Sequence, residues 1–188
     1  LHVEARETAI LANLLGRAPY AMVALAIAAG IVIAVSAASM PTAQIVTWLV
    51  LMIAGLGAMA RAYGQAIAAP FERAALKSFA QDLTAITLYL GFVWGAGAFL
   101  VLPPSSGIFV SLLFAAGMSA LFAGLARERN IALCFLAPAS LLTAFACVLG
   151  AGGAVAAFLV LIGSGAVAAT VMFAARWTAS PRPALQLG

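Results

Sequence analysis

Six long apolar stretches constrain the fold of this chain more than any other feature. They are residues 19–37, 43–60, 83–102, 107–125, 131–149 and 154–175. A helix needs about 20 apolar residues to cross the hydrocarbon core of a bilayer, so each stretch is long enough to span. Only 7% of the residues are charged, whereas a soluble domain carries about 25%. The sequence therefore predicts an all-α, polytopic membrane protein with six transmembrane helices.

The connections between these stretches alternate in charge. Those after the first, third and fifth stretches, at residues 39–42, 103–106 and 150–153, contain no charged residue. All nine Lys and Arg residues lie in the other connections and towards the two ends of the chain. Cytoplasmic loops carry the excess of Lys and Arg in membrane proteins. We therefore predict three helical hairpins in the bacterial inner membrane, with both termini in the cytoplasm.

Two segments outside the stretches have helical patterns of their own. Residues 1–18 place Val3, Ile10 and Leu14 on one face, which predicts an amphipathic helix lying on the cytoplasmic leaflet. Residues 71–81 are expected to form a short connecting helix at headgroup depth. The predicted domain order is an interfacial helix at 1–18 and a six-helix transmembrane domain at 19–176. Residues 177–188 are expected to be a cytoplasmic tail or the start of a linker to an output domain outside this sequence.

Few residues have the chemistry of a reaction centre. The apolar stretches contain no Asp, Glu, Lys, Arg or His, and such groups at bilayer depth usually mark ion or proton paths. Cys134 and Cys147 are too far apart on one helix for a disulfide, at about 20 Å. No nucleotide-binding or zinc-binding motif is present, and the basic residues are scattered instead of forming a nucleic-acid patch. We expect no catalytic site in these residues, no metal, no cofactor and no nucleic-acid partner.

The third stretch holds the densest group of candidate residues. Gly91 and Gly95 form a G-x-x-x-G face that permits close approach of another helix, and Trp94 lies between them near mid-span. Pro138 predicts a kink in the fifth stretch, and Gly117 lies in the middle of the fourth. Two interpretations stay open for these five residues, helix packing or the lining of a ligand pocket.

Residues at the ends of the stretches allow simpler interpretations. Arg61 and Asp82 end and begin neighbouring stretches at the charged side, where they can form an ion pair or lie separately among headgroups. Trp48 and Trp177 lie nearer the ends of their stretches, which is typical of interfacial anchors.

Several short motifs follow one another in a recognisable order. They are Met40-Pro41 followed by Trp48 and Arg61, Gly91-x-x-Trp94-Gly95, Leu102-Pro103, Ala116-Gly117-Met118-Ser119, and Phe135-Leu136-Ala137-Pro138. Over nearly the whole chain, this order resembles the six-helix membrane input module of proteobacterial sensor histidine kinases. The same module occurs in related diguanylate cyclase and phosphodiesterase receptors.

The resemblance implies a sensory domain whose sixth helix leads into a cytoplasmic output domain. It also implies a homodimer and, through a histidine kinase output, a response regulator as partner. After Arg176 the sequence has no heptad signalling helix, phosphoacceptor region or nucleotide-binding motif, so the output domain would lie outside this chain. Three alternatives stay open: a diguanylate cyclase input domain, a small membrane transporter, and a non-catalytic subunit of a membrane complex.

Overall fold

The structure is a computed structural model that describes residues 2–68, 72–101, 117–118, 128–149 and 153–179. Within these residues the protein is helical and contains no strand. The helices are α1 (His2–Ser36), α2 (Thr42–Ala68), α3 (Arg73–Leu100), α5 (Arg129–Leu149) and α6 (Gly153–Ala179). Each of the five contains an apolar segment long enough to cross a bilayer. These five helices indicate a membrane-spanning protein.

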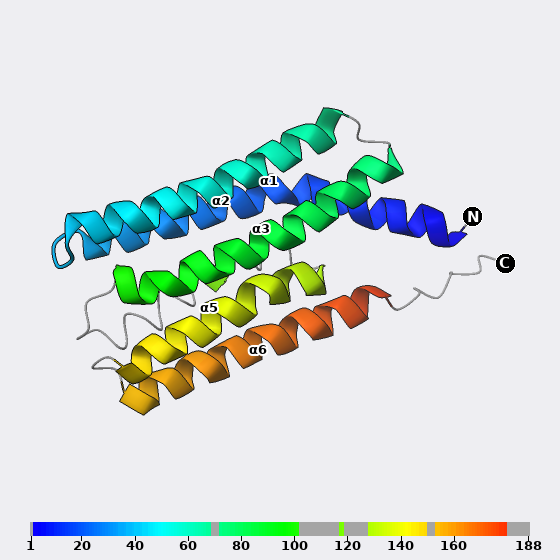
Figure 1. The fold of residues 1–188 in the computed structure, drawn as a ribbon. Helices are drawn as coiled ribbons and strands as arrows, with labels where there is room; N and C mark the ends of the chain where they lie inside the picture. The colour runs from blue at the N-terminus through cyan, green and yellow to red at the C-terminus, as the bar shows by residue number, and fades with distance from the viewer. Residues whose placement is uncertain (1, 69–71, 102–116, 119–127, 150–152, 180–188) are drawn as a thin grey trace.

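The helices lie side by side, with α3 in the middle of the bundle (Figure 1). α3 packs against α1 and α2 on one side and against α5 on the other, and α6 packs on α5. Contacts between Trp48 and Val93, and between Leu51 and Tyr89, show that α2 and α3 are antiparallel. By contrast, Gly91 faces Phe135 and Gly95 faces Ala139, so α3 and α5 run parallel.

The fourth predicted span, residues 107–125, lies outside the described residues except for Gly117 and Met118. Because α3 and α5 are parallel, α3 ends at the opposite end of the bundle from the start of α5 (Figure 1). This is the arrangement that a further span between them requires. The count of six spans stays a prediction.

The first predicted span is the second part of a longer helix. We predicted an interfacial helix at 1–18 followed by a span from residue 19, whereas α1 continues without interruption from His2 to Ser36, with Pro19 inside it. Leu14, Leu15 and Ala18 are buried in the bundle, so packing holds this helix together across the proline. The position of residues 1–18 relative to a membrane stays a prediction.

The predicted connecting helix at 71–81 is likewise the start of a longer element. α3 begins at Arg73 and runs to Leu100 without interruption. Leu76, Phe79 and Leu83 are almost fully buried along its first three turns. Residues 73–81 of the predicted connecting helix therefore form the first turns of α3 and pack into the bundle through Leu76 and Phe79.

A short turn joins α1 and α2 at the uncharged end. The backbone N–H groups of Ser39 and Met40 donate to the carbonyl of Ser36, and those of Gln44 and Ile45 donate to the carbonyl of Pro41. Pro41 stands just before the first turn of α2, where its missing N–H removes no helical hydrogen bond. The turn thus closes the first hairpin with few exposed backbone groups.

Candidate functional site

The two glycines predicted in α3 face α5, and the two helix backbones approach closely there. A Cβ added at Gly91 would lie 2.9 Å from the Cα of Phe135 and 2.9 Å from the Cγ of Pro138. A Cβ at Gly95 would lie 2.7 Å from the Cβ of Leu142. Real side chains do not tolerate such distances, so both positions require glycine for this approach of the two backbones.

An aromatic cluster continues this interface towards α2. The ring centroids of Trp48 and Trp94 are 5.8 Å apart, and those of Trp94 and Phe135 are 6.4 Å apart. Both distances lie within the range of favourable tilted aromatic pairs. The Trp48 indole N–H donates to the backbone carbonyl of Val93 at 2.8 Å. The cluster therefore joins α2, α3 and α5 into one packed unit.

Gly97 and Gly117 make room for the two indoles. A Cβ at Gly97 would lie 2.6 Å from the Nε1 of Trp48, and one at Gly117 would lie 2.9 Å from the Cη2 of Trp94. Gly117 itself is buried. The structure thus brings together all five candidate residues of the packing or pocket group: Gly91, Trp94, Gly95, Gly117 and Pro138.

Trp48 corrects one expectation from the sequence. We expected an interfacial anchor near the end of its span, but Trp48 is only 1% exposed and lies in the core of the bundle. The sequence did contain a signal for this burial, because Trp48 and Gly97 lie at the same depth in their predicted spans. A large side chain that faces a small one across antiparallel helices is typical of a packed core. Phe135 was named only as part of a motif, and its role in the aromatic cluster was not predicted. The side chain of Trp177 lies outside the described part of the chain, so its anchoring role stays a prediction.

The buried hydroxyl groups of this region are already hydrogen-bonded within their own helices. Thr87 donates to the carbonyl of Leu83, Ser140 to that of Leu136, and Thr143 to that of Ala139, each at 2.7 Å. Such bonds to the preceding helical turn satisfy a hydroxyl without a partner from another helix. These groups therefore contribute little free hydrogen-bonding capacity to the α3–α5 interface.

Metal-ligand groupings do not occur in the described parts of the chain: no three His, Cys, Asp or Glu side chains there come together. Cys134 and Cys147 are free thiols, half-buried and buried respectively. Within the described residues, this region is thus a site of packing with no cluster of groups suited to acid–base or metal chemistry.

Arg61 and Asp82 form no ion pair in the described part of the chain, although both residues are described. Each is exposed, and each stands one residue before a buried position, Ala62 in α2 and Leu83 in α3. Each side chain is thus open to its surroundings and does not have the other as a partner. Of the two interpretations left open by the sequence, separate polar residues at the ends of apolar segments fit this geometry.

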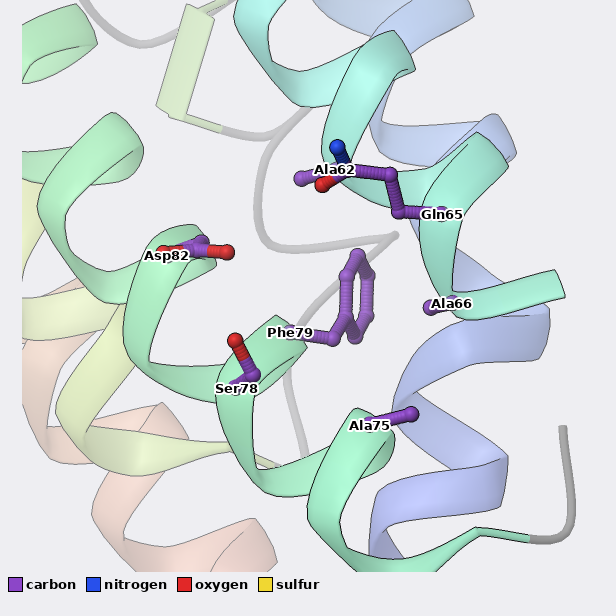
Figure 2. Close-up of a pocket in the computed structure, with 7 residues that line it drawn as sticks. All are labelled: Ala62, Gln65, Ala66, Ala75, Ser78, Phe79 and Asp82. Atoms are coloured by element: carbon purple, nitrogen blue, oxygen red, sulfur yellow. The ribbon is translucent and has the colours of Figure 1, made fainter. Parts of the chain in front are cut away.

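Asp82 instead lines a small pocket between α2 and α3 (Figure 2). The pocket has a volume of about 80 Å³ and is lined by Ala62, Gln65, Ala66, Ala75, Ser78, Phe79 and Asp82. It lies at the charged end of both helices, away from the aromatic cluster.

Comparison with protein families, characterised proteins and solved structures finds no match to this chain.

Proposed function

We propose that this chain is the membrane-embedded input domain of a bacterial signalling receptor, with a histidine kinase as the output. The observation that carries the proposal is the continuous contact from α2 through α3 to α5 at Trp48, Trp94 and Phe135. A signal passed along a membrane bundle needs elements that move as a unit. Glycine contacts between backbones and an interlocked aromatic cluster provide such coupling.

The ends of the helices support an output at the charged side. α1 begins and α6 ends at the same end of the bundle (Figure 1), and Arg61, Arg73 and Lys77 belong to the ends of α2 and α3 on that side. We propose that this side is cytoplasmic, that residues 107–125 form a further span, and that the protein lies in the inner membrane. An output domain following residues 177–188 would then meet soluble partners such as a response regulator.

This topology is testable with cysteine labelling from one side of the membrane. In intact cells, a membrane-impermeant maleimide is expected to label Ser39→Cys, in the uncharged turn, and not Lys77→Cys. Both positions are exposed, whereas the natural Cys134 and Cys147 are partly or fully buried. Labelling of Lys77→Cys alone would reverse the proposed orientation.

The signalling role is tested first by the intact mass of the polypeptide isolated from its natural source. A mass tens of kilodaltons above the 19.0 kDa of this sequence is expected, because an output enzyme must be attached. A mass near 19.0 kDa would contradict the proposal and favour a subunit of a membrane complex.

A second test joins the chain, through residues 177–188, to the soluble core of a histidine kinase. Gly95→Leu is expected to change autophosphorylation several-fold, because the added side chain forces α3 and α5 apart. Gly57→Leu is the matched control, since Gly57 is exposed and a Cβ there meets nothing within 4 Å. Equal autophosphorylation in the wild type and both variants would remove the α3–α5 contact from signalling.

A transporter receives less support from the described residues. Such a protein requires polar groups around a cavity near the middle of the membrane. The buried hydroxyls of Thr87, Ser140 and Thr143 are engaged with their own helices, and the α2–α3 pocket lies at the charged end.

A further inference from the structure

The pocket between α2 and α3 lies at the depth where lipid headgroups are expected. Asp82 is the last charged residue before the uncharged segment 83–100 of α3. Arg61 is the first charged residue after the uncharged segment 42–60 of α2. Because charged residues border the hydrocarbon core of a membrane protein, the pocket sits at the boundary between the acyl chains and the headgroups.

Three polar side chains from two helices converge on this pocket. Figure 2 shows the amide of Gln65, the hydroxyl of Ser78 and a carboxylate oxygen of Asp82 turned towards the same space, with the ring of Phe79 forming a wall. All three polar residues are exposed, whereas Phe79 is buried. The pocket therefore has an apolar wall, a polar edge and access from outside the protein.

Unlike the buried hydroxyls of Thr87, Ser140 and Thr143, the polar groups at the pocket edge have no partner within the described residues. Within the described residues, no hydrogen bond engages the side chains of Gln65, Ser78 or Asp82. By contrast, Thr84, six residues further along α3 than Ser78, donates to the carbonyl of Ala80 at 2.7 Å. The pocket edge thus offers three oxygen acceptors, one of them charged, that are not used by the fold.

We propose that this pocket binds a primary ammonium group, as carried by the headgroup of an aminophospholipid such as phosphatidylethanolamine. A primary ammonium has three N–H donors, which match the carboxylate of Asp82, the amide oxygen of Gln65 and the hydroxyl of Ser78. A cavity volume of about 80 Å³ has room for an ammonium with its first methylenes, since a single water needs roughly 10–15 Å³ on the same measure. The proposal does not depend on the signalling function proposed above.

The oxygen atoms that line the pocket suit an ammonium group better than a metal ion. One carboxylate with two neutral oxygens is a poor match for calcium, which takes about six to eight oxygen ligands. Arg61 adds a reason to prefer a lipid over a soluble amine. It is exposed and lies one helical turn before Gln65 on the same side of α2, where its guanidinium can pair with the phosphate of the same headgroup.

The test uses the full chain in detergent and native mass spectrometry with two lipids of identical acyl chains. Phosphatidylethanolamine is expected to be retained in preference to phosphatidylcholine, whose quaternary ammonium has no N–H to donate. Equal retention of the two lipids by the wild-type protein would overturn the proposal without any variant.

Asp82→Asn is expected to reduce this preference about tenfold, because it replaces a charge-assisted hydrogen bond with a neutral one. Glu72→Gln is the matched control. It removes a carboxylate at the same end of the molecule, and Glu72 makes no side-chain cap for α3 and does not line the pocket. The assignment would be contradicted if Asp82→Asn kept the preference for phosphatidylethanolamine. It would also be contradicted if Glu72→Gln lost this preference to the same extent.

Soluble ethanolamine and Arg61→Gln distinguish the two sources of the ammonium. If the ligand is the lipid, Arg61→Gln weakens phosphatidylethanolamine retention several-fold, and millimolar ethanolamine displaces little lipid. If the ligand is a soluble amine, ethanolamine competes fully in the wild type and not in Asp82→Asn, and Arg61→Gln has no effect. Either result supports an ammonium pocket, whereas lipid retention that responds to neither ethanolamine nor Asp82→Asn overturns it.

Discussion

α3 and α6 both carry closely spaced glycines in an apolar helix, yet the structure gives these glycines opposite surroundings. In α3, Gly91 and Gly95 are buried, and an added Cβ would collide with α5. In α6, Gly163 and Gly165 are exposed, and an added Cβ would meet nothing within 4 Å. Among the described helices, α3 has neighbours on both sides, whereas α6 packs mainly against α5.

The comparison shows what a small-residue motif does and does not establish. Glycine spacing permits close approach of two helices, but a close contact forms only where a second helix lies on the glycine face. Gly91 and Gly95 are one helical turn apart, so both face α5 at successive levels. Gly163 and Gly165 are two residues apart and point to different sides of α6, so they cannot form one contact surface for a neighbouring helix.

The largest difference is expected between leucine substitutions in the two helices. Gly91→Leu should destabilise the protein by about 3 kcal/mol or prevent folding, because the side chain meets the backbone of Phe135 and the ring of Pro138. Gly163→Leu should leave stability nearly unchanged, since its side chain has open space. Thermal unfolding of both variants in one detergent measures the contrast. Similar unfolding temperatures would show that the α3–α5 contact is no tighter than the surface of α6.

A smaller effect is expected from two aromatic hydrogen bonds between α2 and α3. Trp48→Phe removes the buried bond to the carbonyl of Val93, at 2.8 Å, and should cost about 1–2 kcal/mol including the lost volume. Tyr89→Phe removes an exposed bond to the carbonyl of Leu51, at 3.1 Å, and should cost under about 0.5 kcal/mol. If the two variants have the same unfolding temperature, burial beside Gly97 and Trp94 does not strengthen the hydrogen bond of Trp48.

Much of this fold follows from simple features of the sequence. The apolar length of each described span predicted a transmembrane-type helix, and the structure has an apolar helix at all five positions. Gly91, Trp94, Gly95 and Pro138 were each singled out as packing or pocket candidates, because glycine and proline are informative within apolar helices. The residues that they contact were harder to predict from the sequence, because the pairing of α3 with α5 depends on tertiary packing and not on local periodicity.

Helix boundaries were predicted less well than helix positions, and the relation between Arg61 and Asp82 was left open, for identifiable reasons. The first span was predicted to begin at residue 19, but burial of Leu14, Leu15 and Ala18 carries α1 across Pro19. Arg61 and Asp82 share a depth, which left open an ion pair or two separate residues among headgroups, and no ion pair joins them within the described residues. Depth follows from sequence position, but direction depends on the rotation of each helix in the bundle.

The smallest expected effect concerns the start of α5, the helix that α3 and α6 share. Partial burial raises the pKa of Glu128 above its ordinary value of 4.5. The folded protein therefore holds this proton more tightly than the unfolded chain. The free energy of unfolding that Glu128 contributes is greatest below pH 4.5 and declines as the pH rises through the folded pKa.

Glu128→Gln should remove that part of the decline, because glutamine does not titrate. The effect should be small, since Glu128 is half-exposed and screened by solvent. Unfolding temperatures of the wild type and Glu128→Gln between pH 4 and pH 7 measure it, with Glu72→Gln as the exposed control. A decline of the same size in all three proteins would place its origin elsewhere. A decline absent only from Glu128→Gln would show that the start of α5 is packed in the folded protein, as the partial burial of Glu128 indicates.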